Sequence, residues 1–212
     1  RYSNAHIITG SLSPGRMNEY EALVGLCMGI GLAAASGFRV FLPPFVLSLF
    51  VKWGSVEVDL SGSAFEYFDS DMAVLLLGAA TLVEALAYYV PWVDNLLDSI
   101  ASPAAVIAGT GMTAILLEGN TDPVFQWALA IIAGGGISGT IQASTVVIRG
   151  ASTMMTGGLG NPAVSTVENV ASFAFALLAI LLPFLAALGA FALLYLAVKK
   201  GMEKKSQTNY SV

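Results

Sequence analysis

The chain has 212 residues, of which 56% are hydrophobic and 11% are charged, and its formal net charge is −5. Its mean hydropathy is +0.77, and a water-soluble globular domain does not have this balance. The composition therefore predicts an integral membrane protein. Nucleic acid is excluded as a partner, because the chain has no basic domain surface to meet phosphate groups.

Long apolar runs predict the membrane spans. A helix needs about 20 apolar residues to cross a bilayer, and such runs occupy 22–50, 72–91, 101–118, 124–149 and 163–199. The last run is too long for one ordinary span, and Pro183 divides it in two. We therefore predict an all-α integral membrane protein with about six transmembrane helices. Five helices are the alternative, if the last run forms one kinked helix.

The distribution of charge predicts the orientation. A lysine cluster follows the last span at Lys199, Lys200, Lys204 and Lys205, whereas residues 51–71 are acidic. The positive-inside rule then places the carboxyl end in the cytoplasm, and six passes bring the amino end to the same side. Residues 1–16 are polar and are expected to be a disordered tail or an upstream extension. The first membrane repeat is expected at 17–118, the second at 119–200, and a cytoplasmic tail at 201–212.

The two halves of the chain share a pattern that predicts an internal repeat. One shift in register aligns small residues of the first span with residues of the fourth: Gly25, Gly29, Ala33 and Gly37 with Gly135, Gly139, Ala143 and Val147. Three spans per half would give the halves opposite orientations, an arrangement typical of transporters with a solute site near the midplane. Small residues at every fourth position let helices approach closely, so spans one and four are expected to cross there. Packing alone also explains these residues.

Charged residues inside the apolar runs are the stronger signal. The first shift also aligns Arg39 with Arg149, and a second shift aligns Thr81, Glu84 and Tyr88 with Ser165, Glu168 and Ser172. A charge near the bilayer centre costs about 2.5–3.5 kcal/mol on insertion scales, so such side chains face protein or water. We expect Arg39 to pair with Glu84 by preference and Arg149 with Glu168. A structural salt bridge and a transport pathway both explain such pairs.

Backbone breaks are predicted after both arginines. Pro43 and Pro44 interrupt the first run and are expected to leave Leu42 and Pro43 outside helical geometry. Residues 149–162 are rich in glycine and hydroxyl side chains, which predicts an ordinary loop or a re-entrant segment lining a cavity. Asp98, in a short connection, is expected to be a solvated helix cap or turn residue; weak cation binding together with Asp94 is the alternative.

The same residues carry a resemblance to a known family. The run GIGLAAASGFRVFLPP at 29–44, with a later STVENV at 165–170, resembles the bacterial membrane-protein family known as domain of unknown function 4126. The likeness extends from about Met17 to Lys200, and the segment before Met17 departs from the family pattern. It implies a compact polytopic protein of the bacterial inner (plasma) membrane. The family has no established activity to carry over.

No catalytic motif supports an enzyme, since there is no nucleophile elbow, P-loop or Cys/His cluster. We expect no cofactor and no metal site. The sequence predicts a transporter or channel for a small solute or ion, with proton coupling as an option; membrane lipid and a homo-oligomeric copy are further expected partners. Glu84 and Glu168 would exchange protons or cations, Arg39 and Arg149 would be counter-charges or anion ligands, and further polar contacts would come from Gln142, Ser144 and Thr145. The alternative is a non-transporting membrane scaffold or assembly subunit, in which the Arg/Glu pairs are structural.

Overall fold

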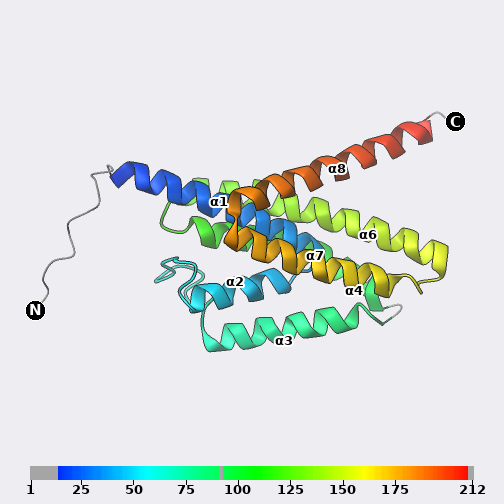
Figure 1. The fold of residues 1–212 in the computed structure, drawn as a ribbon, viewed down its shortest axis with the longest axis horizontal. Coiled ribbons are helices and arrows are strands. Elements are labelled where there is room, and N and C mark those ends of the chain that lie inside the picture. The colour runs from blue at the N-terminus through cyan, green and yellow to red at the C-terminus, as the bar shows by residue number, and fades with distance from the viewer. Residues whose placement is uncertain (1–13, 91–92, 210–212) are drawn as a thin grey trace, which may run out of the picture.

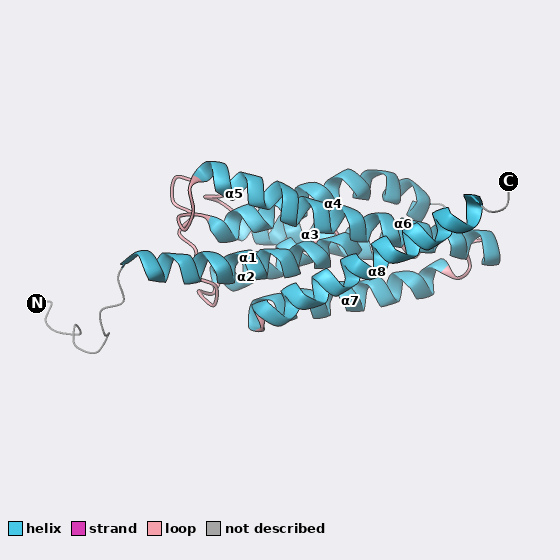
Figure 2. Cartoon of the chain, turned by 90° about the horizontal axis from the view of Figure 1, so that it is seen from above, coloured by secondary structure: helices cyan, strands magenta, loops and turns pink. Residues whose placement is uncertain are grey.

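The computed structural model describes residues 14–90 and 93–209, and within these ranges its regular elements are helices. They lie roughly side by side in an elongated bundle (Figures 1 and 2). In chain order they are α1 (Pro14–Phe38), α2 (Leu42–Lys52), α3 (Asp71–Ala87), α4 (Val93–Leu117), α5 (Pro123–Leu129), η1 (Ala130–Gly135), α6 (Gly136–Thr156), α7 (Asn161–Leu181) and α8 (Pro183–Asn209).

The helices are long and apolar enough for a multi-pass membrane protein. Among the described residues, 5 segments meet the length and composition of a membrane span: Glu19–Phe38, Leu96–Leu117, Pro123–Thr156, Asn161–Leu181 and Pro183–Glu203. The predicted all-helical membrane fold is therefore confirmed. The predicted run at 72–91 corresponds to α3, which has 17 residues and is shorter than these segments. Pro183 does divide the last run, since α7 ends at Leu181 and α8 begins at Pro183.

The first apolar run is two helices, separated at residues 39–41. Pro43 and Pro44 lie in the first turn of α2, where a proline sacrifices no helical hydrogen bond and its fixed φ favours the start of a helix. The prediction that Leu42 and Pro43 are non-helical is therefore wrong. The break precedes the prolines and includes Arg39 itself.

The glycine-rich segment at 149–162 is also more helical than predicted. α6 continues to Thr156 and ends where Gly157 adopts φ 63°, the left-handed conformation that glycine favours at a helix end. Only four residues, 157–160, separate α6 from α7. The prediction of a loop or re-entrant segment is thus wrong for 149–156. At the other end of the chain, residues 201–209 continue α8, while residues 1–13 of the expected amino-terminal tail and residues 210–212 of the expected cytoplasmic tail lie outside the described residues.

Glycines of α1 allow this helix to occupy the centre of the bundle. A Cβ on Gly25 would lie 2.2 Å from the backbone oxygen of Leu116 in α4, and one on Gly29 would lie 2.9 Å from Thr113 Cα. A Cβ on Gly31 would lie 2.7 Å from side chains of α7 and α8, and one on Gly37 would lie 2.5 Å from Ile141 of α6. Such approaches are possible only without a side chain. α1 is thereby surrounded by α4, α6, α7 and α8.

The predicted counterparts in the fourth span pack mainly on α4. A Cβ on Gly135 would lie 2.6 Å from Thr110, and one on Gly139 would lie 2.9 Å from Val106. Ala143 is exposed, unlike the fully buried Ala33 with which it was aligned, so it takes no part in this packing.

The directions of the helices do not match the predicted inverted repeat. α1 and the continuous α5–α6 segment run in the same direction along the bundle (Figure 1). An inverted repeat would make these two helices antiparallel. α3 and α7 do run in opposite directions, but the pair that carries the glycine pattern is parallel. The glycine pattern shared by α1 and the α5–α6 segment therefore gives no support to inverted halves.

An apolar core fills the space around α1. Fully or almost fully buried side chains meet there from five helices: Leu32, Leu47, Ile115, Ala179 and Ala186. This core occupies the middle of the bundle, and a set of buried polar side chains lies next to it, beyond the carboxyl end of α1.

Candidate functional site

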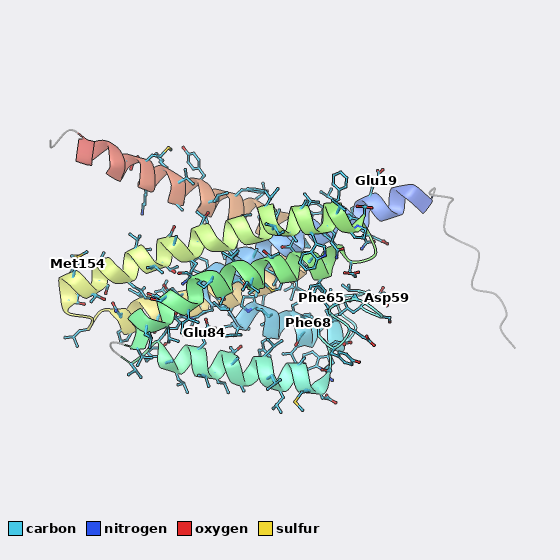
Figure 3. All side chains as sticks on the ribbon, turned by 180° about the vertical axis from the view of Figure 1, so that it is seen from behind. Glu19, Asp59, Phe65, Phe68, Glu84 and Met154 are labelled. Atoms are coloured by element: carbon cyan, nitrogen blue, oxygen red, sulfur yellow. The ribbon has the colours of Figure 1, made fainter. Side chains whose placement is uncertain are left out.

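The break between α1 and α2 leaves backbone amides that require an acceptor. Glu84, at the end of α3, supplies it: Oε1 accepts a hydrogen bond from the Val40 amide at 2.7 Å, and Oε2 accepts one from the Phe41 amide at 3.0 Å. The carboxylate lies at the amino end of α2, where the helix dipole favours negative charge. Figure 3 shows Glu84 on the side of α3 that faces the bundle. Glu84 therefore fixes the α1–α2 break through the backbone.

Arg39 lies within the same break and extends towards α7. Its Nη1 lies 3.2 Å from Oε2 of Glu168, its Nε donates to Oδ1 of Asn169 at 2.5 Å, and its Nη2 donates to the backbone oxygen of Ser165 at 3.1 Å. The side chain is 1% exposed. The preferred pairing of Arg39 with Glu84 is thus not the one formed, because Arg39 pairs with Glu168.

Arg149 approaches Glu168 from α6. It forms ion pairs with Glu168 and with Asp98 of α4, and its side chain is also 1% exposed. The predicted Arg149–Glu168 pair is therefore present, but both arginines share this carboxylate. Arg39, Glu168, Arg149 and Asp98 therefore form one connected group of ion pairs.

Tyr88 joins the group from the end of α3. The guanidinium carbons of Arg39 and Arg149 lie over its ring, 4.1 and 3.9 Å from the centroid, as cation–π contacts require. The Tyr88 hydroxyl donates to Asp98 at 3.2 Å, and its backbone oxygen accepts from Ser165 at 3.3 Å. We refer to Arg39, Glu84, Tyr88, Asp98, Arg149 and Glu168 as the buried charge cluster; each member is at most 7% exposed.

The buried charge cluster contains one more carboxylate than guanidinium groups. With the three carboxylates and the two guanidinium groups ionised and Tyr88 neutral, its formal charge is −1, compensated in part by the amino end of α2 beside Glu84. A buried excess charge is costly unless a proton, a cation or a dipole balances it. The arrangement can therefore accept one proton or one monovalent cation. Across the described residues, no three His, Cys, Asp or Glu side chains are placed to hold a metal ion.

Polar atoms in and beside the cluster have unused hydrogen-bonding capacity. Oε1 of Glu168, Nε of Arg149 and Nε2 of Gln142 are buried and lack a hydrogen-bond partner within the part of the chain that the structure describes. Natural proteins satisfy most buried polar groups, so several unsatisfied atoms in one region mark a place for water or a ligand. Oε2 of Glu168 forms ion pairs with both arginines, whereas its Oε1 has no hydrogen-bond partner among the described residues.

A cavity of about 360 Å³ adjoins the cluster between α6 and α7. Its lining residues are Phe38, Thr145, Ile148, Ala163, Val164, Val167 and Glu168. Ile148 and Val167 are 55% and 67% exposed, so the cavity opens at the outer surface of the bundle. Glu168 is the only ionisable residue in its lining.

A second cavity, of about 620 Å³, lies towards the opposite end of the bundle from Met154, near Glu19 and Asp59 in Figure 3. It is not part of the cluster. Four acidic residues line it: Glu21, Glu57, Asp59 and Glu118. The Ser61 amide donates to Asp59 at 3.1 Å and holds the pKa of that carboxyl below its usual value. This end of the protein therefore keeps a negative surface that attracts cations.

Several side chains that were predicted to contribute polar contacts lie outside the cluster or donate hydrogen bonds to the backbone of their own helix. Thr81 donates to the backbone oxygen of Leu77, and Ser144 to that of Thr140, so neither hydroxyl joins the cluster. Thr145 donates to the Gln142 backbone and lines the smaller cavity. Gln142 is buried on the same face of α6 as Arg149.

Sequence reasoning missed two members of the site. Asp98 was expected to be a solvated cap or turn residue, but it is 6% exposed and pairs with Arg149. Asn169 was not singled out, although it directly follows Glu168 and contacts Arg39. The available signal for Asp98 was its place directly before a long apolar run, where an acidic side chain needs a partner.

The comparisons with known proteins identify the family of the chain. A family described as "Domain of unknown function (DUF4126)" matches residues 26–200, which include the whole buried charge cluster. The chain belongs to this family. Neither the search of curated proteins nor the search of solved structures finds a match to this chain. The DUF4126 assignment confirms the resemblance seen in the sequence, and it brings no activity with it.

Proposed function

We propose that this DUF4126 protein moves a small solute or ion across the bacterial inner membrane, that movement is coupled to protons, and that the buried charge cluster forms part of the pathway. On this proposal the protein is not an enzyme. The observation that carries the proposal is that Arg39 and Arg149 share Glu168, which lines a cavity and whose second oxygen has no hydrogen-bond partner among the described residues.

Protonation of Glu168 would act on two contacts at once. Its negative charge attracts Arg39, next to the α1–α2 break, and Arg149, on α6. A proton on Glu168 removes that charge and weakens both ion pairs, which frees the arginines for another partner. A transporter requires such an element with two arrangements, because a ligand or proton shifts an equilibrium only through its different affinity for the two states.

The remaining contacts of Glu168 and Glu84 assign them different roles. Glu84 uses both oxygens on backbone amides at the α1–α2 break. We assign Glu168 as the proton or cation acceptor and Glu84 as the residue that positions the break. Arg39 and Arg149 provide counter-charges, and the acidic cavity at the other end favours the approach of cations.

The test is proton-linked current from purified protein in liposomes on a solid-supported membrane, with inorganic ions and small carboxylates as trial solutes. Wild type is compared with Glu168→Gln and with Asp71→Asn. Asp71 is a suitable control, because its side chain is 97% exposed and forms its ion pair with a surface residue, Lys52. We expect a solute-dependent current in wild type and Asp71→Asn that falls by about tenfold or more in Glu168→Gln, as loss of a charged contact worth about 1.5–3 kcal/mol implies.

An equal current in Glu168→Gln would contradict the assigned role of Glu168. The scaffold alternative has a different signature. It predicts no current from any variant across the solute screen, together with a lower unfolding midpoint for Glu168→Gln.

A further inference from the structure

The cavity between α6 and α7 combines apolar walls with one buried carboxylate in its lining. Its walls are apolar side chains from three helices, chiefly Phe38, Ile148, Val164 and Val167. Glu168 lines the same cavity, is 4% exposed and carries an oxygen without a hydrogen-bond partner among the described residues. Its volume of about 360 Å³ lies within the range of about 300–1,000 Å³ that is usual for small-molecule sites.

The position of the opening limits how a molecule could enter. The residues around it, including Ile148, Ala163 and Val167, are exposed on the outer surface of α6 and α7. Both helices have the length and apolar character of membrane spans, so this surface faces lipid. Glu168 is the eighth residue of α7, about 10 Å along the helix axis from its amino end. The entrance is therefore lateral, from the bilayer.

The negative charge beside the cavity determines which polar group a bound molecule can place there. Glu168 joins the cavity to a cluster with a formal charge of −1, and its Oε1 has no hydrogen-bond donor within the described part of the chain. Of the charged groups in the cluster, Glu168 is the one that lines the cavity, so an anionic head entering there would meet its carboxylate first and be repelled. An ammonium group supplies both the missing donor and the missing positive charge, and hydrogen bonds between charged groups are the stronger ones.

We infer that this cavity binds an amphipathic primary amine, with its alkyl part between α6 and α7 and its ammonium group on Glu168. The inference rests on the proposed function in one respect, since it names the class of solute that the transporter would take from the membrane. Thr145 also lines the cavity, and its hydroxyl oxygen offers a second polar contact. Binding itself requires no transport.

The test is photoaffinity labelling of the full chain in lipid nanodiscs. The probe is an alkylamine of about eight carbons with a diazirine in its chain, and the matched probes are the alkanol and the alkyl sulfonate with the same diazirine. Labelled peptides are mapped by mass spectrometry, and unlabelled octylamine is used as competitor. The variants are Glu168→Gln and Ala163→Trp; the second places an indole at the exposed mouth of the cavity, where it does not disturb the core. Leu82→Trp, on the exposed face of α3, is the control for an added indole.

We expect the amine probe to label peptides from α6 and α7 in a way that octylamine suppresses. Glu168→Gln and Ala163→Trp should each reduce this labelling by about tenfold or more, and Leu82→Trp should leave it unchanged. Equal labelling by the sulfonate probe, or labelling that Glu168→Gln leaves unchanged, would overturn the inference, because either result indicates partitioning along an apolar surface.

The two proposals fail in distinguishable ways. Labelling that meets these criteria, in a protein that gives no current with octylamine or with the other trial solutes, leaves the amine site in place and removes the transport function. A current that depends on Glu168, in a protein that the amine probe does not label, removes the amine site and leaves transport of a different solute.

Discussion

Arg149 is the residue whose loss should cost the most stability. Its guanidinium group neutralises Asp98 and Glu168 and lies over Tyr88, and it is 1% exposed. Removing one partner of a buried ion pair leaves an uncompensated charge and typically costs about 3–5 kcal/mol. We therefore expect Arg149→Ala to lower the free energy of unfolding by about that amount, measured by denaturant titration in detergent micelles.

The matched control for this prediction is Lys52→Ala. Lys52 also forms an ion pair, with Asp71, but that carboxylate is 97% exposed, and exposed pairs contribute about 0–1 kcal/mol. A loss for Arg149→Ala as small as that for Lys52→Ala would show that water reaches the cluster in solution.

The residues of the site were partly predictable one at a time, but their contacts were not. Arg39, Arg149, Glu84 and Glu168 stand out because a charge inside an apolar run must have a buried partner. The choice of partner depends on how helices distant in sequence are rotated about their axes, and periodicity within one helix contains no such information. Asp98 shows the same point, since its sequence neighbourhood is typical of a helix start and only the position of Arg149 makes it a buried counter-ion.

Close packing at the level of helices gives a second prediction. A methyl group on Gly25 would meet the backbone oxygen of Leu116 at 2.2 Å, so α1 and α4 would have to separate. Gly111, inside α4, has open space around its Cβ position. We expect Gly25→Ala to lower the unfolding midpoint, whereas Gly111→Ala should be neutral or stabilising by up to about 1 kcal/mol, because alanine favours a helix over glycine.

Thermal unfolding of both variants in the same detergent measures this difference. Equal effects of the two substitutions would mean that α1 and α4 are not in close contact at Gly25.

Helix boundaries were predictable where the local chemistry is decisive. The four-residue spacing of glycines in α1 predicted a packing helix, and Pro183 predicted the division between α7 and α8. The prolines after Arg39 were misjudged, because proline interrupts a helix that contains it but is well accommodated in a first turn. At 149–156 the hydroxyl side chains weakened the predicted helix, yet burial of one face of α6 outweighs that intrinsic preference.

At the scale of the whole molecule, the direction of the helices determines the topology. α1 starts at one end of the bundle and α8 finishes at the other (Figure 1), whereas six passes were expected to bring both termini to one side. The exposed lysines Lys199 and Lys200 belong to the end at which α8 finishes. α6 ends there too, so Met154 marks the same end, and Asp59 marks the opposite one in Figure 3. The positive-inside rule therefore predicts that Met154 faces the cytoplasm and Asp59 the outside.

Single cysteines test this orientation in a chain whose own cysteine, Cys27, is replaced by alanine. Asp59 is exposed, and Met154 is 84% exposed, so Asp59→Cys and Met154→Cys should both be reactive and tolerated. In intact bacterial cells, a membrane-impermeant maleimide should label Asp59→Cys at once and Met154→Cys only after lysis. The reverse pattern would invert the orientation and place the acidic cavity in the cytoplasm. Labelling of both in intact cells would mean that α1–α8 do not form a bundle that spans the membrane, because the two positions lie at opposite ends of the same parallel set of helices.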